Sequence, residues 1–191
     1  MILCASYVTK GFREDVKVDK QEEIVDLTPG KSYRIAYVSN GAPVYTPWTC
    51  IKKIGHMKYM MQSEKSFGES CYPGRYYNNV GYIDAIRINL YPNLALYKQF
   101  SKIESSEGYG FYLLGRNEYT SMHINAMRKE REYGFVWTGT ASGGTMAEII
   151  ELDQSDLTMT MSVDRKAYIF PTFNLDMSLA KFVSPNIINI P

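Results

Sequence analysis

Apolar and polar residues alternate along much of the chain, and this pattern predicts β-strands. The clearest case is 157–163 (LTMTMSV), where alternation predicts a strand with one face on a core and one polar face. A second long alternation, interrupted only by Asp84, predicts a strand at 80–90. Shorter patterns predict strands at 2–9, 22–27, 32–39, 44–54, 57–62, 109–114, 134–140, 145–152 and 167–172.

Turn-forming residues separate these segments. TPGK at 28–31 and NGAP at 40–43 flank the strand 32–39, which predicts a hairpin over 32–54. ASGG at 141–144 and Asp-Arg-Lys at 164–166 predict two more hairpins. Strands at this spacing are typical of a mainly β fold, and we expect an antiparallel sandwich, jelly roll or barrel of roughly 8–10 strands.

Helical spacing is less common, so we expect only one or two short helices. Asn93 is a suitable N-cap, and the apolar residues after it predict a helix over 94–104. Apolar residues also share one helical face within 118–131. A further short helical turn is expected at 175–182, before Pro185.

Composition is close to the globular average, with 45% hydrophobic and 21% charged residues among 191. These values exclude wholesale disorder and collagen-like or coiled-coil composition. No repeat or linker divides the chain, so we expect a single β-rich domain over 1–191. Its apolar ends, MILCASYV and FVSPNIINIP, are suited to act as extended terminal arms.

Net charge, cysteine count and hydropathy restrict the binding partners and the cellular location that we expect. A formal charge of +1 is too balanced for non-specific binding of double-stranded nucleic acid. The odd number of three cysteines favours a reducing compartment, and no run of residues is long enough to span a membrane. We therefore expect a cytoplasmic or virion protein. We expect no signal peptide, because the apolar run MILCASYV is short and no positively charged region precedes it.

Charge is nevertheless distributed unevenly. The segment 43–65 carries a local charge of +3, whereas 133–163 contains four carboxylates and no Lys or Arg. Opposite charges of this kind can orient one subunit against another, or can pair within one molecule. The sequence leaves both interpretations open.

Side chains suited to catalysis are scarce. Only His56 and His123 could act as a histidine base, and Cys71 in GESCYPG is the best nucleophile available to pair with one of them. A zinc site from Cys50, His56 and Cys71 would lack the close ligand spacing that is usual for that ion. We therefore assign no catalytic residue, no metal ligand and no cofactor, and expect a protein that is not an enzyme.

Glu148 is the one carboxylate that the pattern places on a buried face. In a strand over 145–152 it shares the face of Ile150 and Leu152. Thr145 and Glu148 also match a helix capping box, which is the competing interpretation.

The most distinctive segment is 62–79, which shows no clear periodicity. Long loops in compact domains are often functional, and this one carries Tyr72, Arg75, Tyr76 and Tyr77. Tyr and Arg dominate protein interfaces, and they also stack on bases or sugars. We name these four residues as a candidate binding or interface site, with a lid of tyrosines folded over the core as the alternative.

Three functions agree with these features. The first is a non-enzymatic structural or assembly subunit making protein–protein contacts as a homo- or hetero-oligomer, for example in a virus or phage particle. The second is a β-barrel or sandwich module that binds a small ligand or glycan through the Tyr-rich loop. The third is a cysteine-dependent hydrolase that uses Cys71.

Overall fold

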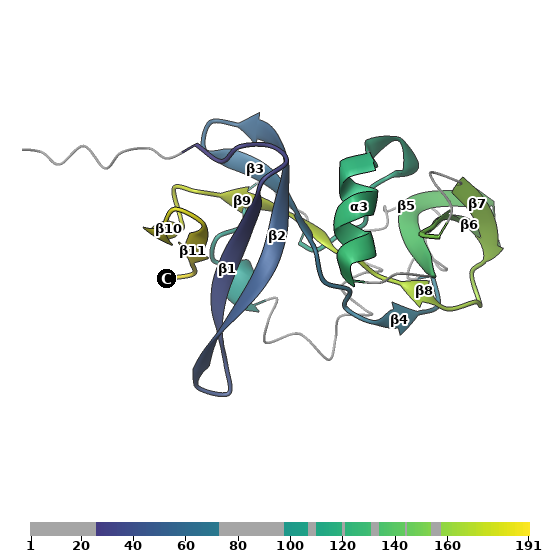
Figure 1. Ribbon diagram of the computed structural model, residues 1–191, viewed down its shortest axis with the longest axis horizontal. Helices are drawn as coiled ribbons and strands as arrows, with labels where there is room; N and C mark the ends of the chain where they lie inside the picture. Colours follow the sequence, from purple (N-terminus) through teal and green to yellow (C-terminus); the bar gives the residue numbers. More distant parts are fainter. Residues whose placement is uncertain are drawn as a thin grey trace, which may run out of the picture.

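The computed structural model describes residues 26–72, 98–106, 110–119, 121–130, 134–143, 145–153 and 158–191. Within these residues, eleven strands form two sheets (Figure 1). The helical parts are α3 (Ser121–Glu130), the 3-10 turn η2 (Arg116–Glu118) and a short helical stretch at 98–100. The prediction of a mainly β fold is confirmed. The expected strands at 2–9 and 80–90 lie outside the described residues.

The first sheet has six strands in the order β10-β11-β1-β2-β3-β9. All neighbours pair antiparallel except β1 and β11, which pair parallel, with Arg34 opposite Ile187. The C-terminal residues are therefore part of this sheet rather than a free arm. The strands are β1 (Ser32–Ser39), β2 (Ala42–Gly55), β3 (Lys58–Ser63), β9 (Thr172–Asp176), β10 (Lys181–Ser184) and β11 (Ile187–Asn189).

The β1–β2 hairpin forms as the sequence predicts, and β1 has the expected bounds. Asn40 and Gly41 form the two-residue turn with φ of 51° and 77°. Two positive φ angles define a type I′ turn, which Asn-Gly favours because both residues tolerate the left-handed region. The hairpin extends beyond the body of the molecule in Figure 1.

The expected helical turn at 175–182 is wrong, because the segment contains the end of β9, a turn and the start of β10. Leu175 is fully buried and pairs with Tyr59 of β3, whereas Leu179 is 45% exposed. The two leucines therefore do not share a buried face. The Asp176 carboxylate accepts hydrogen bonds from the backbone N–H and the hydroxyl of Ser178, which stabilises a turn there.

The second sheet has five strands in the order β4-β8-β5-β6-β7. The expected hairpin at 141–144 is confirmed, since Gly143 of β5 pairs with Met146 of β6. Glu148 lies within β6, so the strand interpretation holds over the helix cap. The strands are β4 (Glu69–Ser70), β5 (Phe135–Gly143), β6 (Met146–Glu151), β7 (Thr158–Ser162) and β8 (Ala167–Tyr168).

The expected hairpin between 157–163 and 167–172 is wrong. A turn does form, with the Arg165 N–H donating to the Ser162 carbonyl at 2.9 Å. However, β8 pairs with β4 and β5, and β7 pairs with β6 on the far side of the sheet. Of the strand expected at 109–114, the described residues 110–114 form one bridge, between Tyr112 and Thr172. Of the helix expected at 94–104, only 98–100 is described as helical.

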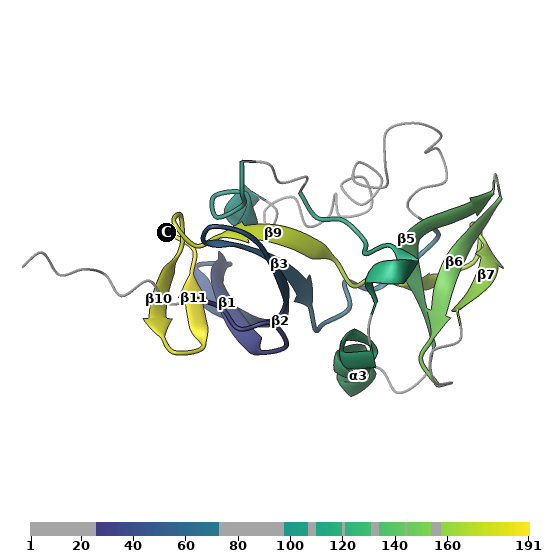
Figure 2. The same cartoon turned by 90° about the horizontal axis from the view of Figure 1, so that it is seen from above.

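Two apolar clusters hold the molecule together. The larger cluster includes buried residues of both sheets, such as Trp48 and Ile149, and its centre is a group of aromatic rings. The smaller cluster joins α3 to the other face of the five-stranded sheet, through Ile124, Met127 and Ile150 among others. The two sheets lie toward opposite ends of the long axis, and α3 lies between them (Figure 2).

Candidate functional site

Tyr72 is a core residue in this structure. Its side chain is 4% exposed, and its ring lies edge-on to Trp137 with centroids 5.0 Å apart. Its backbone N–H donates to the Val163 carbonyl at 2.9 Å. For Tyr72 this placement agrees with the lid interpretation rather than with an exposed contact. Arg75, Tyr76 and Tyr77 lie outside the described residues.

The two described cysteines differ in their surroundings. Cys50 is fully buried, and burial raises the pKa of its thiol to about 11, which leaves it protonated and a poor nucleophile at neutral pH. Cys71 is exposed, and its thiol donates to the Asp164 carbonyl at 3.4 Å. His123 is buried in α3, with its ring against Tyr119. Within the described ranges, no group of three or more Cys, His, Asp or Glu is placed to hold a metal ion.

The charged segments pair locally. Lys52 of the basic segment lies 3.6 Å from Glu118, and Lys53 lies 2.9 Å from Asp26. In the acidic segment, the half-buried Glu148 lies 3.5 Å from Arg116. Each of these three pairs joins a charged segment to a residue outside both segments, so they lie within one molecule but do not join the two segments to each other.

The edges of the two sheets differ in how they are covered. Beside β9, bridges to Glu104 and Tyr112 cover the edge. The edge strand β10 carries Lys181 and a bulge between Phe182 and Ser184, and both features hinder pairing with another chain. Among the described residues, β7 pairs only with β6 and has no such protection.

The outer edge of β7, which no other described residue pairs with, is regular and uncharged. Its register with β6 runs without a shift from Met146 opposite Ser162 to Ile150 opposite Thr158. Met159 is 46% exposed, and Thr160 is also exposed. The alternation in the sequence predicted the strand, but it did not indicate that this strand would end the sheet.

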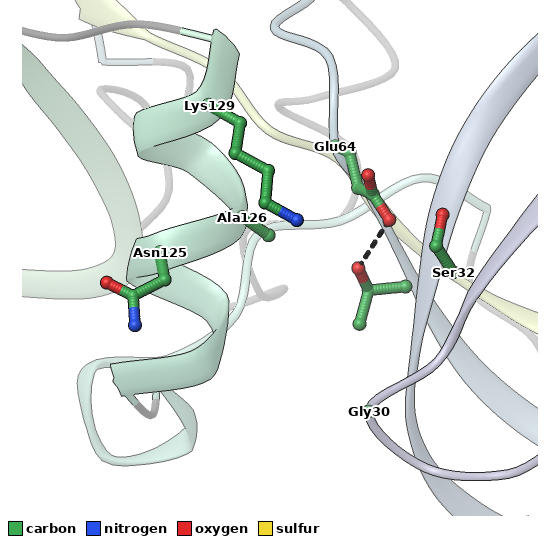
Figure 3. A pocket seen from close by; sticks show the side chains of 7 residues that line it. Gly30, Ser32, Glu64, Asn125, Ala126 and Lys129 are labelled. Atoms are coloured by element: carbon green, nitrogen blue, oxygen red, sulfur yellow. Dashed lines mark hydrogen bonds between the residues drawn. The ribbon is translucent and has the colours of Figure 1, made fainter.

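A polar pocket of about 360 Å3 lies between α3 and the six-stranded sheet (Figure 3). Glu64 follows β3 and points into the pocket, and Lys129 extends from α3 toward it. The Thr49 hydroxyl donates to Glu64 Oε1 at 2.8 Å, and Thr49 itself is 5% exposed. The lining residues are Gly30, Ser32, Thr49, Glu64, Asn125, Ala126 and Lys129. No local sequence pattern links them.

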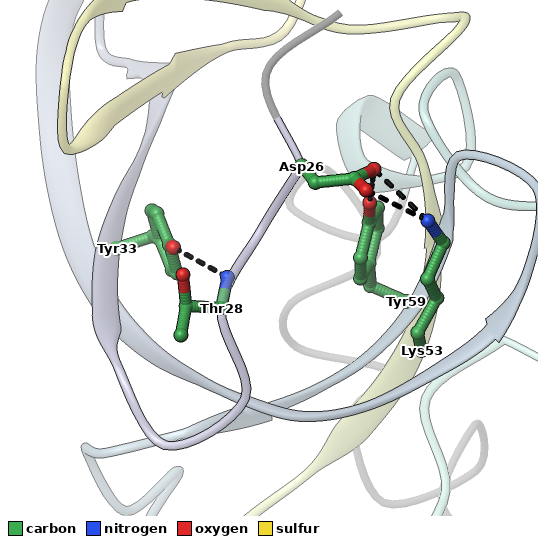
Figure 4. A network of polar contacts seen from close by, with 5 residues as sticks. All are labelled: Asp26, Thr28, Tyr33, Lys53 and Tyr59. Atoms are coloured by element: carbon green, nitrogen blue, oxygen red, sulfur yellow. Dashed lines mark hydrogen bonds and ion pairs between the residues drawn. The ribbon is translucent and has the colours of Figure 1, made fainter.

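A second polar group fixes the start of the described chain to the sheet (Figure 4). The Asp26 carboxylate accepts hydrogen bonds from the Tyr59 hydroxyl and from the Lys53 ammonium, the latter at 2.9 and 3.0 Å. These contacts lower the pKa of Asp26. Burial, together with the Asp26 hydrogen bond, raises the pKa of Tyr59 to about 12. The three residues form a structural clasp, which we call the Asp26 clasp.

Comparison with protein-family models, curated proteins and solved structures finds no match to this chain. Across the described segments, none of the helices has the length and apolar character needed to cross a membrane. The β7 edge and the polar pocket are therefore the features of the molecule that bear on its function.

Proposed function

We propose that the protein is a non-enzymatic assembly subunit that pairs with a second copy of itself along the free edge of β7. The observation that carries this proposal is the regular and uncharged outer edge of that strand, which is unpaired in the part of the chain that the structure describes. An unpaired edge presents backbone N–H and C=O groups that another strand can satisfy.

The sequence of β7 is suited to pairing with itself. TMTMS is nearly symmetrical about Thr160, so in an antiparallel pair Met159 lies opposite Met161 of the partner subunit, and Thr158 lies opposite Ser162 of the partner subunit. Similar side chains then meet on each face. A contact that uses the same surface on both copies closes as a two-fold dimer. The dimer would join two five-stranded sheets into one continuous sheet.

The setting of a virus or phage particle is part of the same proposal and rests on analogy alone. A closed two-fold dimer would serve as the building unit of such a particle, whose further contacts would use other surfaces. Hetero-oligomeric assembly is the alternative, in which a different chain occupies the β7 edge.

Size-exclusion chromatography with light scattering over a range of concentrations tests the proposal. The unaltered chain is expected to form a dimer as its concentration rises. Thr160→Lys puts two ammonium groups opposite each other at the two-fold axis, so it should shift the protein to monomer. Val183→Lys, on the protected edge strand β10, is the matched control and should leave the dimer intact.

Two results would contradict the proposal. One is a strict monomer at the highest concentration reached by the unaltered chain. The other is a dimer that survives Thr160→Lys but is lost in Val183→Lys, which would place the contact on the six-stranded sheet.

A further inference from the structure

We propose that the pocket between α3 and the six-stranded sheet binds a small zwitterion with the charge pattern of a free α-amino acid. The pocket volume of about 360 Å3 lies within the range of about 300–1,000 Å3 that is typical of small-molecule sites. This site is separate from the β7 edge and does not depend on dimer formation.

The anionic side of the pocket is held in place by the six-stranded sheet. Glu64 donates its backbone N–H to the Pro47 carbonyl at 3.0 Å, and its Oε1 accepts the bond from the buried Thr49. Within the described part of the chain, Glu64 Oε2 accepts no hydrogen bond. A fixed carboxylate with an oxygen available is a receptor for an ammonium group.

The cationic side belongs to α3. Ile124 and Met127 pack on the five-stranded sheet, so the positions Asn125 and Lys129, one turn apart, lie toward the pocket. Figure 3 shows the Lys129 ammonium extending across the pocket toward Glu64. The Lys129 ammonium nitrogen and the Glu64 carboxylate oxygens lie more than 4.0 Å apart, so the two residues form no ion pair. Neither residue forms an ion pair with another described residue.

Two opposite charges are thus held apart on different supports, one on α3 and one on the sheet. A ligand ammonium at Glu64 together with a ligand carboxylate at Lys129 satisfies both charges at once. Because Lys129 is exposed and Glu64 is partly exposed, a direct contact between them would contribute little to stability, so little is lost when the ligand comes between them.

The remaining lining residues favour a polar ligand side chain. The Ser32 hydroxyl supplies a donor and an acceptor, and Ala126 leaves space because its side chain is small. Asn125 supplies its amide NH2 as a donor, since its Oδ1 already accepts a hydrogen bond from Arg128 at 3.4 Å. Since the ligand contacts both α3 and the sheet, binding should stabilise the folded chain against heat.

Thermal unfolding and isothermal titration calorimetry of the full chain test the proposal, with L-alanine, L-glutamine, L-glutamate and L-lysine as probes. At least one probe is expected to bind and to raise the melting temperature. Lys129→Met and Glu64→Gln should each weaken that binding by about tenfold or more, whereas Lys129→Arg retains the charge and should retain most of the affinity. Lys166→Met and Glu69→Gln, which remove exposed charges outside the pocket lining, are the matched controls.

The melting temperature of each variant without ligand reports whether it folds. Absence of binding by all four amino acids at millimolar concentration would overturn the proposal. Binding that is unchanged in both Lys129→Met and Glu64→Gln would overturn it too, because the ligand would then lie elsewhere. If ethylamine or acetate binds as tightly as the amino acids, the two-charge recognition is wrong.

Discussion

The two apolar clusters of this protein differ in kind: both sheets contribute to the larger one, whereas the smaller one joins α3 to one face of the five-stranded sheet. Five aromatic residues pack together in the larger cluster, against the six-stranded sheet. The ring of Trp48 lies 5.0–6.3 Å, centroid to centroid, from the four other rings. The rings are Trp48, Phe67, Phe100, Phe111 and Phe173. Against the five-stranded sheet, α3 packs through a cluster of six buried residues, of which only Phe170 is aromatic.

This difference indicates where the molecule is rigid and where it can yield. The aromatic cluster connects strands to the segments around Phe100 and Phe111, which are distant in the sequence, so its loss should affect the whole fold. The cluster under α3 is small and local. We therefore expect α3 to be released more easily than any strand of the six-stranded sheet.

Trp48→Ala should have the largest effect. The side chain is fully buried and contacts four aromatic rings, so its removal should lower the free energy of unfolding by about 3–5 kcal/mol. Urea denaturation followed by far-UV circular dichroism measures this change. Val38→Ala, at an exposed position of β1, is the control and should change stability by less than about 0.5 kcal/mol. A Trp48→Ala effect as small as that of the control would contradict the central role of the aromatic cluster.

Met127→Ala should have a smaller and more local effect. Met127 is 1% exposed and contributes to the α3 cluster, so its truncation should cost about 2–3 kcal/mol, near the lower end for a buried methionine. Hydrogen exchange should become faster in α3 while β1 to β3 keep their protection. Equal loss of protection in both regions would show that the two cores are not distinct.

Gly139→Ala tests how closely β5 packs against the backbone of the segment around Leu113. A Cβ atom at this position would lie 2.6 Å from the Leu113 carbonyl oxygen, which is backbone and cannot move aside easily. We expect a loss of about 1–3 kcal/mol in the free energy of unfolding, measured by urea denaturation. Gly55→Ala in β2 is the matched control, because its Cβ would meet only the flexible Lys58 side chain, at 3.4 Å. Similar losses in both variants would remove the explanation by close approach.

Asp26→Asn should have the smallest effect, and the effect should depend on pH. The Asp26 clasp lowers the pKa of this carboxyl below its ordinary value of 3.8. Its contribution to stability is therefore complete above that value and is lost as the pH falls through the lowered pKa of the folded state. The difference in urea midpoint between the original chain and Asp26→Asn should be present at pH 7 and vanish in strong acid. A difference that is constant over this pH range would contradict the ionic role of Asp26.

Local sequence patterns predicted the strands of the hairpins well. Alternation and the Asn40-Gly41 turn predict the bounds of β1 correctly, because residues on one face of that strand are largely buried and those on the other are largely exposed. In β9, four of the five residues are buried, so alternation is absent. The pattern therefore predicts no strand over 173–176, and the last two residues of β9 fall within the expected helical turn at 175–182. Asn174 is tolerated there because its Oδ1 accepts a hydrogen bond from the Tyr112 hydroxyl.

Strand order and the candidate sites could not be predicted in the same way. The turn at 164–166 was correctly expected, but no local signal shows that β8 leaves β7 to pair with β5. The pocket joins Glu64 to Lys129 across two different elements, and each residue alone has the pattern of an ordinary surface charge. Such sites depend on tertiary contacts, which a pattern of neighbouring residues does not contain.

The parallel pairing of β1 with β11 has a consequence for how the protein is made. On a ribosome, β1 emerges early, whereas β11 follows roughly 150 residues later, an interval on the order of ten seconds at about 5–20 residues per second. During that time the edge of β1 that faces β11 lacks its native partner. The nascent chain must keep this edge from pairing with other polypeptides until its own last strand arrives.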